Sequence, residues 1–293
     1  ESIPPLPARL FKSQKLISIP KKEIFKTMFS SGTSGSQSKI YIDKESSLRQ
    51  IKVLKKIFSQ YLGYERLPMI IIDNLEDIKN QKEFNAKKAA ISGFSIFGKD
   101  YFYIQNKNSN PNINKLKKYL EKYKNEKILV FGFTDKVFDL FFQNNFLIKN
   151  KISFSNCILI HGGGWKKMEK YKISNFSFKK KIKKKYNFSK IINYYGMIEQ
   201  TGSIFLECEN CGAFRSSCFS EVYVRDKNFN ILKEGKGLIQ IYSILPSSYP
   251  GHNIITEDEG EILDNSCKSC KNNKRFLVYG RAKKSEVRGC SNV

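Results

Sequence analysis

The sequence is poor in several kinds of residue that common protein functions require. It holds only two histidines, His161 and His252, and no G-x-S-x-G segment, so a serine-hydrolase triad is not expected. No apolar run approaches the roughly 20 residues that cross a bilayer, and no secretory signal is visible at the start of the chain. Lysines and arginines number 52 against 27 acidic residues, yet only eight of the 52 are arginines. The net charge of +25 favours anionic ligands or an acidic partner protein.

The sequence contains enough apolar residues for a folded protein. Its 293 residues, 40% of them hydrophobic, allow about two domains with a sizeable core. Four of the seven cysteines form two C-x-x-C pairs, which fits a reducing cytoplasm better than a disulfide scaffold. The chain begins at Glu1 and not at a methionine, so we expect a fragment or a processed product.

The spacing of apolar residues predicts alternating helices and strands through the first two thirds of the chain. An amphipathic helix is expected over residues 48–62, entered near 43–47 and ending before Gly63. Continuous apolar runs predict buried strands at 69–72, 128–133, 157–160 and 191–192. Helices are expected at 113–123 and, with Thr134 or Asp135 as its N-terminal cap, through Phe141. This order indicates an α/β fold with a mainly parallel, helix-covered sheet and ligands at the carboxyl ends of its strands.

The pattern changes at about residue 207. Short alternating runs at 221–225, 238–242 and 276–279 are separated by turn residues and indicate a smaller β-rich unit. We therefore expect two domains, residues 1–205 and residues 206–293.

Residues 30–39, SSGTSGSQSK, form a candidate phosphate-binding loop. Gly32 and Gly35 let the backbone adopt positive φ and approach a ligand closely. Backbone N–H groups, hydroxyls and the Lys39 ammonium could then face the same small volume, which suits a polyphosphate. The spacing differs from the G-x-x-x-x-G-K-[ST] loop of common nucleotide-binding proteins. The alternative is a flexible surface loop, because runs of serine and glycine are common in linkers.

The two C-x-x-C pairs have the spacing of zinc knuckles. Cys208 with Cys211 and Cys267 with Cys270 would supply four thiolates to a tetrahedral site and join two distant β segments. Four protein ligands leave no open position, so this zinc would be structural. Reduced free thiols are the alternative, and Cys218 is an alternative ligand.

Three further segments carry polar groups of interest. Glu199 follows the expected strand at 191–192 and is either a surface charge or, beside a polyphosphate, a Mg²⁺ ligand. The lysine-rich stretch at 179–185 is interpreted as a solvated helix face or loop, with a docking patch as the alternative. The thiol of Cys290 lies near Arg288, which favours its thiolate, although an idle thiol is equally consistent with the sequence.

Taken in order, the segments SSGTSGSQSK, HGGGW, YYGMIEQTG, SYPGHNIITEDEG and GRAKKSEVRGC resemble one known family. The chain is similar, from about residue 3 to residue 292, to the LuxE-type acyl-protein synthetases (long-chain-fatty-acid:protein ligases). These belong to the adenylate-forming, acyl-CoA synthetase-like superfamily. The resemblance implies the large N-terminal domain of such ligases with a smaller β-rich subdomain. It also implies that the C-terminal lid of the larger enzymes, which carries a catalytic lysine, is absent.

The resemblance also assigns roles to individual residues. It implies that the loop closed by Lys39 holds the ATP phosphates, that Glu199 binds Mg²⁺, and that Cys290 accepts the acyl group. Asp258 is implied as the ribose contact, and Arg281, the arginine of the family's G-R motif, is implied as a further ATP-binding residue. The implied ATP-binding residues are, for the phosphates, Ser30, Ser31, Gly32, Thr33, Ser34, Gly35 and Ser36, and, for the adenosine, Gly162, Gly163, Gly164, Tyr195 and Gly196.

The function implied is ATP-dependent activation of a carboxylic acid, expected to be a fatty acid, followed by thioester formation on Cys290. The acyl group would then pass to a partner reductase or transferase. One alternative ends on coenzyme A or a carrier protein. Another, from a different class, is a zinc-containing basic nucleic-acid-binding protein, against which the scarcity of arginine counts. We expect a cytoplasmic ligase without a nucleic-acid partner or a membrane span.

Overall fold

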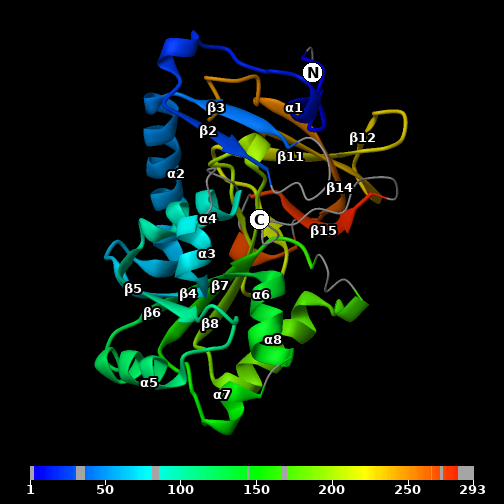
Figure 1. Cartoon of the computed structure of the whole chain (residues 1–293). Coiled ribbons are helices and arrows are strands. Elements are labelled where there is room, and N and C mark those ends of the chain that lie inside the picture. The colour runs from blue at the N-terminus through cyan, green and yellow to red at the C-terminus, as the bar shows by residue number, and fades with distance from the viewer. Residues whose placement is uncertain are drawn as a thin grey trace. The chain divides into compact units, whose positions relative to one another are not determined.

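The computed structural model describes residues 3–30, 37–80, 86–143, 145–165, 170–264, 266–270 and 273–282 (Figure 1). The chain divides into two compact units. The first consists chiefly of Glu1–Gln60 and Tyr194–Arg288, and the second chiefly of Tyr61–Asn193. The division expected at residue 206 follows a change in the strand pattern, whereas the compact units group the first sixty residues with the C-terminal third.

The predicted α/β architecture with a mainly parallel sheet is confirmed. The six-stranded sheet has the order β5-β4-β6-β7-β8-β9. Strand β4 pairs in parallel with β5 and β6, strand β6 pairs in parallel with β7, and β9 adds an antiparallel edge to β8. The bounds of these strands are Leu67–Asn74 for β4, Gly98–Gln105 for β5, Ile128–Phe133 for β6, Cys157–Gly162 for β7, Lys190–Tyr195 for β8 and Phe205–Leu206 for β9.

Helices of the second unit cover both faces of its strands. Alternate side chains of a strand point to opposite faces, and both sets are apolar here, so each face needs a helical cover. One face packs its apolar residues against α5 (Ile113–Lys122), α6 (Thr134–Phe138) and α8 (Asn175–Tyr186) in a single core. The other face includes Phe131, whose ring stacks on Phe94 of α4 (Ala86–Ser95) with centroids 4.2 Å apart. This double covering explains why β4, β6 and β7 are continuous apolar runs.

The remaining helices of the second unit are short. They are α3 (Leu75–Asn80), a π-helical turn η2 (Asp139–Gln143) that continues α6, and α7 (Phe146–Lys149). The lysine-rich stretch forms the last turns of α8. Its lysines lie on the solvent side of that helix, while Phe178, Ile182 and Tyr186 are buried on the other.

The first unit is built on a seven-stranded sheet. Its main order is β10-β15-β14-β13-β11-β12, and β1 pairs in parallel with β14. The predicted runs at 221–225, 238–242 and 276–279 correspond to β11, β13 and β15. The bounds are Leu6–Pro7 for β1, Phe214–Arg215 for β10, Ser220–Arg225 for β11, Ile231–Leu232 for β12, Lys236–Ser243 for β13, Asn253–Leu263 for β14 and Arg275–Arg281 for β15.

The first unit also contains a two-stranded hairpin and several helices. Strand β2 (Lys26–Phe29) pairs antiparallel with β3 (Lys39–Ile42). The helices are α1 (Leu10–Ser13), α2 (Lys44–Leu62) and the 3₁₀ turns η1 (Lys21–Glu23), η4 (Ile198–Gln200) and η5 (Lys268–Cys270). Helix α2 matches the predicted helix, since Asp43 Oδ1 accepts a hydrogen bond from Ser46 N at 2.7 Å and Gly63 ends it with φ of +80°.

One predicted helix start was wrong in detail. Helix α6 begins at Thr134, but neither Thr134 nor Asp135 caps it. The Thr134 hydroxyl instead donates to the carbonyl oxygen of Gly162 at 3.1 Å and lies 3.1 Å from Nδ1 of His161. A tertiary contact with the end of β7 thus takes the hydroxyl that the sequence pattern assigned to the helix.

Within the described ranges, every helix is too short or too polar to cross a membrane.

Candidate functional site

The candidate phosphate loop emerges from a closed neck formed by Ser30 and Ser38. The backbone N–H of Ser30 donates to the carbonyl oxygen of Ser38 at 3.0 Å. The backbone N–H of Ser38 donates to Oγ of Ser30 at 2.8 Å. Both serines are buried, and they lie at the ends of β2 and β3, where Phe29 pairs with Lys39. The hairpin therefore fixes where the loop leaves and re-enters the fold, with the exposed Lys39 as the first residue of β3.

Glu199 contacts this neck directly. The Ser38 hydroxyl donates to Oε1 of Glu199 at 2.6 Å, and the Glu199 side chain is buried in η4. Burial raises the pKa of Glu199, while the hydrogen bond from Ser38 and the positive charge of Arg281 act to lower it. The predicted loop and the predicted metal-binding carboxylate are thus brought together.

The residues after Glu199 are held by buried hydrogen bonds. The Gln200 side-chain amide donates to the carbonyl oxygens of Ile241 at 2.9 Å and Gly251 at 2.7 Å. Thr201 Oγ1 accepts a hydrogen bond from Nε2 of Gln50 on α2 at 2.7 Å. These contacts connect η4 to β13 of the seven-stranded sheet and to α2. The position of Glu199 is therefore fixed by both elements.

Tyr195, Asp258 and Arg281 form a second polar group in the first unit. Tyr195 ends β8, and its hydroxyl donates to Oδ2 of Asp258 at 2.7 Å. Asp258 and Arg281 are cross-strand partners on β14 and β15, and Arg281 forms ion pairs with Asp258 at 3.7 Å and with Glu257 at 3.2 Å. Burial raises the pKa of Asp258, against the effects of the Arg281 charge and the Tyr195 hydrogen bond. Of three residues that the resemblance linked to ATP, Asp258 therefore contacts the other two.

The glycine-rich segment lies in the second unit. Gly162 ends β7, Gly163 has φ of +82°, and Gly164 follows before Trp165. Burial and the nearby Lys179 charge lower the pKa of His161 to about 3, so its imidazole is neutral. Gly196 directly follows β8, and a Cβ added there would meet Cδ1 of Ile204 at 2.6 Å, so a larger residue would displace the end of the Ile204 side chain.

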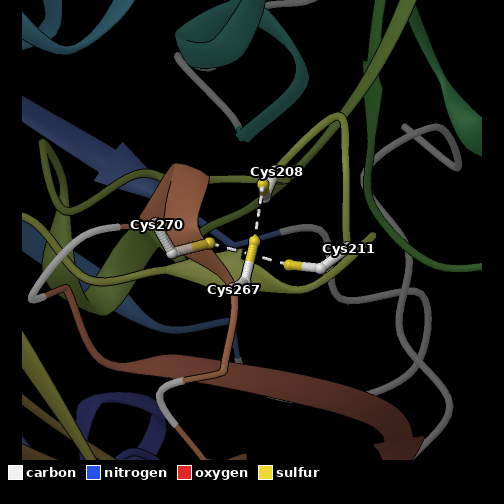
Figure 2. Close-up of side chains that lie close together, drawn as sticks. All are labelled: Cys208, Cys211, Cys267 and Cys270. Carbon is white, nitrogen blue, oxygen red and sulfur yellow. Dashed lines mark hydrogen bonds between the residues drawn. The ribbon is translucent and has the colours of Figure 1, made fainter.

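The four predicted zinc ligands converge. Figure 2 shows Cys208, Cys211, Cys267 and Cys270 pointing toward one another, and their Sγ atoms all lie within 4.8 Å of one another. All four are free thiols, and Cys218 is exposed and outside this cluster. Although burial acts to raise it, hydrogen bonds from the Ala213 backbone and the Arg275 side chain lower the pKa of Cys211 to about 7.

Some candidate residues lie outside the described part of the chain. These are Cys290 and the tip of the loop, Ser31, Gly32, Thr33, Ser34, Gly35 and Ser36. Their predicted roles remain predictions.

Comparison with known families identifies the chain. The model of the LuxE acyl-protein synthetases matches residues 1–293. The chain belongs to the LuxE acyl-protein synthetase family. A sequence comparison with curated proteins found no match.

Several solved structures are similar to this LuxE-family chain. An open conformation of 2-hydroxyisobutyryl-CoA ligase, in complex with 2-HIB-AMP and CoA, aligns over 90% of this chain and 58% of its own, with a TM-score of 0.67 and 14% identity. The amide bond synthetase McbA from Marinactinospora thermotolerans has a TM-score of 0.58 and 13% identity, over 90% of this chain and 52% of its own. The N-terminal domain of FACL13 from Mycobacterium tuberculosis has a TM-score of 0.56 and 15% identity, over 87% of this chain and 60% of its own.

At these identities the likeness establishes the fold. The LuxE-family chain spans somewhat more than half the length of the 2-hydroxyisobutyryl-CoA ligase that it matches. The fold expected from the resemblance is therefore confirmed.

Two residues of the LuxE-family site were missed by sequence reasoning. Ser38 lies within the quoted loop motif, yet its contact with Glu199 spans 161 positions and no spacing rule predicts it. Gln200 stands beside the motif glutamate, and a buried glutamine between two partner carbonyls leaves no recognisable pattern in the sequence.

Proposed function

We propose that the chain activates a carboxylic acid with ATP to form an acyl-adenylate and then transfers the acyl group to a thiol. The single observation that carries the proposal is the contact of Glu199 with the neck of the serine- and glycine-rich loop. It is supported by the cluster of Tyr195, Asp258 and Arg281, which offers a carboxylate to the ribose hydroxyls of ATP. Membership of the LuxE family favours this ligase over the nucleic-acid-binding alternative.

In the first step, a carboxylate oxygen of the acid attacks the α-phosphorus of ATP. The bond from the α-phosphorus to the bridging oxygen breaks, and pyrophosphate leaves. Negative charge grows on the phosphoryl oxygens during this step, so positive groups that are already in place lower the barrier. We assign this role to Lys39 and to the backbone N–H groups of the loop, with Tyr195 orienting Asp258 for the ribose.

Mg²⁺ suits the donor set at Glu199. A buried carboxylate with a hydroxyl at 2.6 Å presents hard oxygen donors, and this ion binds through one or two carboxylates together with phosphate oxygens. Glu199 would hold it. When bound, the ion would neutralise charge on the phosphates. The Ser38 hydrogen bond favours the ionised form of Glu199, which is the form that binds a cation.

In the second step, a thiolate attacks the carbonyl carbon of the acyl-adenylate. The carbon–oxygen bond to AMP breaks, AMP leaves, and a thioester forms. We assign the acceptor role to Cys290 and propose a fatty acid as the substrate. The acyl group would then pass from Cys290 to a reductase or transferase. If coenzyme A or a carrier protein is the acceptor instead, the first step is the same and Cys290 is dispensable.

Carboxylate-dependent exchange of pyrophosphate into ATP tests the first step. Fatty acids of graded length serve as substrates, and Mg²⁺ is supplied. We expect Lys39→Ala and Glu199→Gln to lower the exchange rate by at least about tenfold, since each removes a charge from the phosphate site. Lys44→Ala, at the start of α2, is the control for loss of one lysine. Parental exchange in both site variants would refute the assignment of the loop and of Glu199.

Mass spectrometry after incubation with ATP and a fatty acid tests the second step. We expect an acyl adduct on the peptide that contains Cys290, absent in Cys290→Ser and present in Cys218→Ser. Transfer to coenzyme A or a carrier protein by Cys290→Ser at the parental rate would instead favour an external thiol. In both outcomes the exchange assay reports on activation independently.

A further inference from the structure

We infer that Cys208, Cys211, Cys267 and Cys270 bind one Zn²⁺ ion, which joins two turns of the β-rich unit. The first turn lies between β9 and β10 and carries Cys208 and Cys211. The second lies between β14 and β15 and carries Cys267 and Cys270. The inference does not depend on the proposed ligase activity.

The sulfur positions already match a tetrahedral thiolate site. Zinc–sulfur bonds of about 2.3 Å place the sulfurs of such a site about 3.8 Å apart. The Sγ atoms of Cys208 and Cys267 are 4.0 Å apart, and those of Cys211 and Cys270 are 3.6 Å apart (Figure 2). Each of these contacts joins a cysteine of one turn to a cysteine of the other. Two disulfides would require each pair to approach to about 2.05 Å, and even then would not explain why all four sulfurs converge.

The backbone of both turns is folded as metal knuckles require. In the first turn, Gly212 has φ of +72° and its N–H donates to the carbonyl oxygen of Cys208 at 2.9 Å. In the second, the Cys270 N–H donates to the carbonyl oxygen of Cys267 at 3.0 Å. Each turn is therefore tight enough to present both of its thiols on the same side (Figure 2).

Groups around the cysteines also suit a bound ion. Four thiolates around Zn²⁺ leave a net charge of −2, which a neighbouring cation stabilises. The Arg275 side chain, which is 5% exposed, forms a hydrogen bond with Cys211 and an ion pair with Asp264 at 2.6 Å. Its Nε–H is buried without a hydrogen-bond partner among the described residues. Asn210 donates to Ser269 Oγ, which links the two turns through the residues inside the C-x-x-C pairs.

The site is structural, because four protein ligands leave no position for a substrate. It closes the turn of the β14–β15 hairpin, where Leu263 pairs with Arg275. The same hairpin carries Asp258 opposite Arg281. Loss of the ion should therefore destabilise the β14–β15 hairpin at its turn. It should also weaken ATP binding, and this second effect rests on the proposed function.

Metal analysis of the purified whole chain tests the site without any assay of activity. We expect about one zinc per chain after gel filtration, and exchange into Co²⁺ should give the visible absorption bands and sulfur charge-transfer bands of a tetrahedral thiolate site. Cys267→Ser should hold less than about a tenth of the parental zinc, whereas Cys218→Ser should hold all of it.

Cobalt exchange uses the parental chain, so it remains informative if Cys267→Ser does not fold. Parental protein that holds no zinc and gives no thiolate–cobalt bands would overturn the inference. Full zinc content in Cys267→Ser would do the same, as would four oxidised cysteines in parental protein kept under reducing conditions. A zinc-loaded chain that lacks pyrophosphate exchange would refute the proposed function and leave the zinc site standing.

Discussion

The hydroxyl of Ser38 donates a 2.6 Å hydrogen bond to Oε1 of Glu199, across 161 positions of the sequence. Hydrogen bonds to an ionised carboxylate are short and stronger than those between neutral groups. This one joins the neck of the candidate phosphate loop to the only carboxylate that the family resemblance assigns to Mg²⁺. The loop and the metal ligand are thereby positioned by the same contact, so a change at Ser38 should affect both.

The Ser38 contact predicts a pH effect. Burial raises the pKa of Glu199 and the Ser38 hydrogen bond lowers it, so Ser38→Ala should raise that pKa further. Because only the ionised carboxylate binds Mg²⁺, activity falls as the pH drops through the pKa. The acid limb of kcat/KM for pyrophosphate exchange should therefore move to higher pH in Ser38→Ala, because the variant lacks a hydrogen bond that favours the ionised carboxylate. Ser38→Thr keeps the hydroxyl and should retain the parental profile; an unmoved limb in Ser38→Ala would contradict the prediction.

The hydrogen bond from Tyr195 to Asp258 predicts a change in ATP binding. Tyr195→Phe removes a 2.7 Å hydrogen bond that orients the carboxylate we assign to the ribose. We expect the KM for ATP to rise about tenfold with little change in kcat, which corresponds to the loss of one hydrogen bond to a charged group. Tyr279→Phe is the matched control, since its hydroxyl also binds a carboxylate of the same hairpin, Glu261, but on the surface. Equal effects in the two variants would remove the special role of Tyr195.

The strands that the sequence predicts best are those buried on both faces. Residues 69–72, 128–133 and 157–160 are apolar without interruption, so burial alone identifies them. Strand β14 was not predicted, because its last eight residues, TEDEGEIL, contain three consecutive acidic residues and show no alternation of apolar and polar side chains. The positions of Asp258 and Arg281 on facing strands follow from that unpredicted strand.

The residues of the candidate sites differ in how they could be identified from the sequence. The C-x-x-C spacing identified all four clustered cysteines, because each pair lies within one turn and needs no knowledge of the fold. The family resemblance supplied Asp258 and Arg281, which no local pattern marks. Neither source could identify the contact between Ser38 and Glu199 or the amide of Gln200, since both depend on how distant segments pack.

A buried ion pair in the second unit predicts a large stability effect. Lys87 Nζ lies 3.0 Å from Oδ2 of Asp73, and both side chains are at most 3% exposed. Lys87→Met leaves a buried, uncompensated carboxylate, so the free energy of unfolding should fall by about 3–5 kcal/mol. Urea denaturation measures this. Lys107→Met breaks an exposed pair with Glu76 and should cost less than about 1 kcal/mol.

The double variant Lys87→Met with Asp73→Leu separates a charge effect from a packing effect. It removes both charges, so it should be more stable than Lys87→Met alone. A double variant as unstable as the single one would show that the methylenes of Lys87, and not its charge, contribute the stability.

Gly202, three residues after Glu199, predicts a coupled loss of stability and activity. Its φ is +90°, and an added Cβ would meet Cγ of Gln50 at 2.9 Å and Cδ1 of Leu245 at 3.1 Å. Gly235 has nearly the same φ, +89°, but open space around it. Gly235→Ala should therefore cost about 1 kcal/mol from backbone strain alone. Gly202→Ala should cost a further 1–3 kcal/mol, roughly, because Gln50 or the η4 segment must move.

Movement at Gly202 should also reach the candidate site. Gln50 donates the hydrogen bond that holds Thr201, so its displacement shifts the segment that carries Glu199. We expect Gly202→Ala to lower pyrophosphate exchange at a temperature where both variants are fully folded, while Gly235→Ala exchanges at the parental rate. Denaturation curves and exchange rates for the two variants, measured side by side, test this prediction. Parental exchange in a folded Gly202→Ala protein would mean that the packing around η4 does not control the position of Glu199.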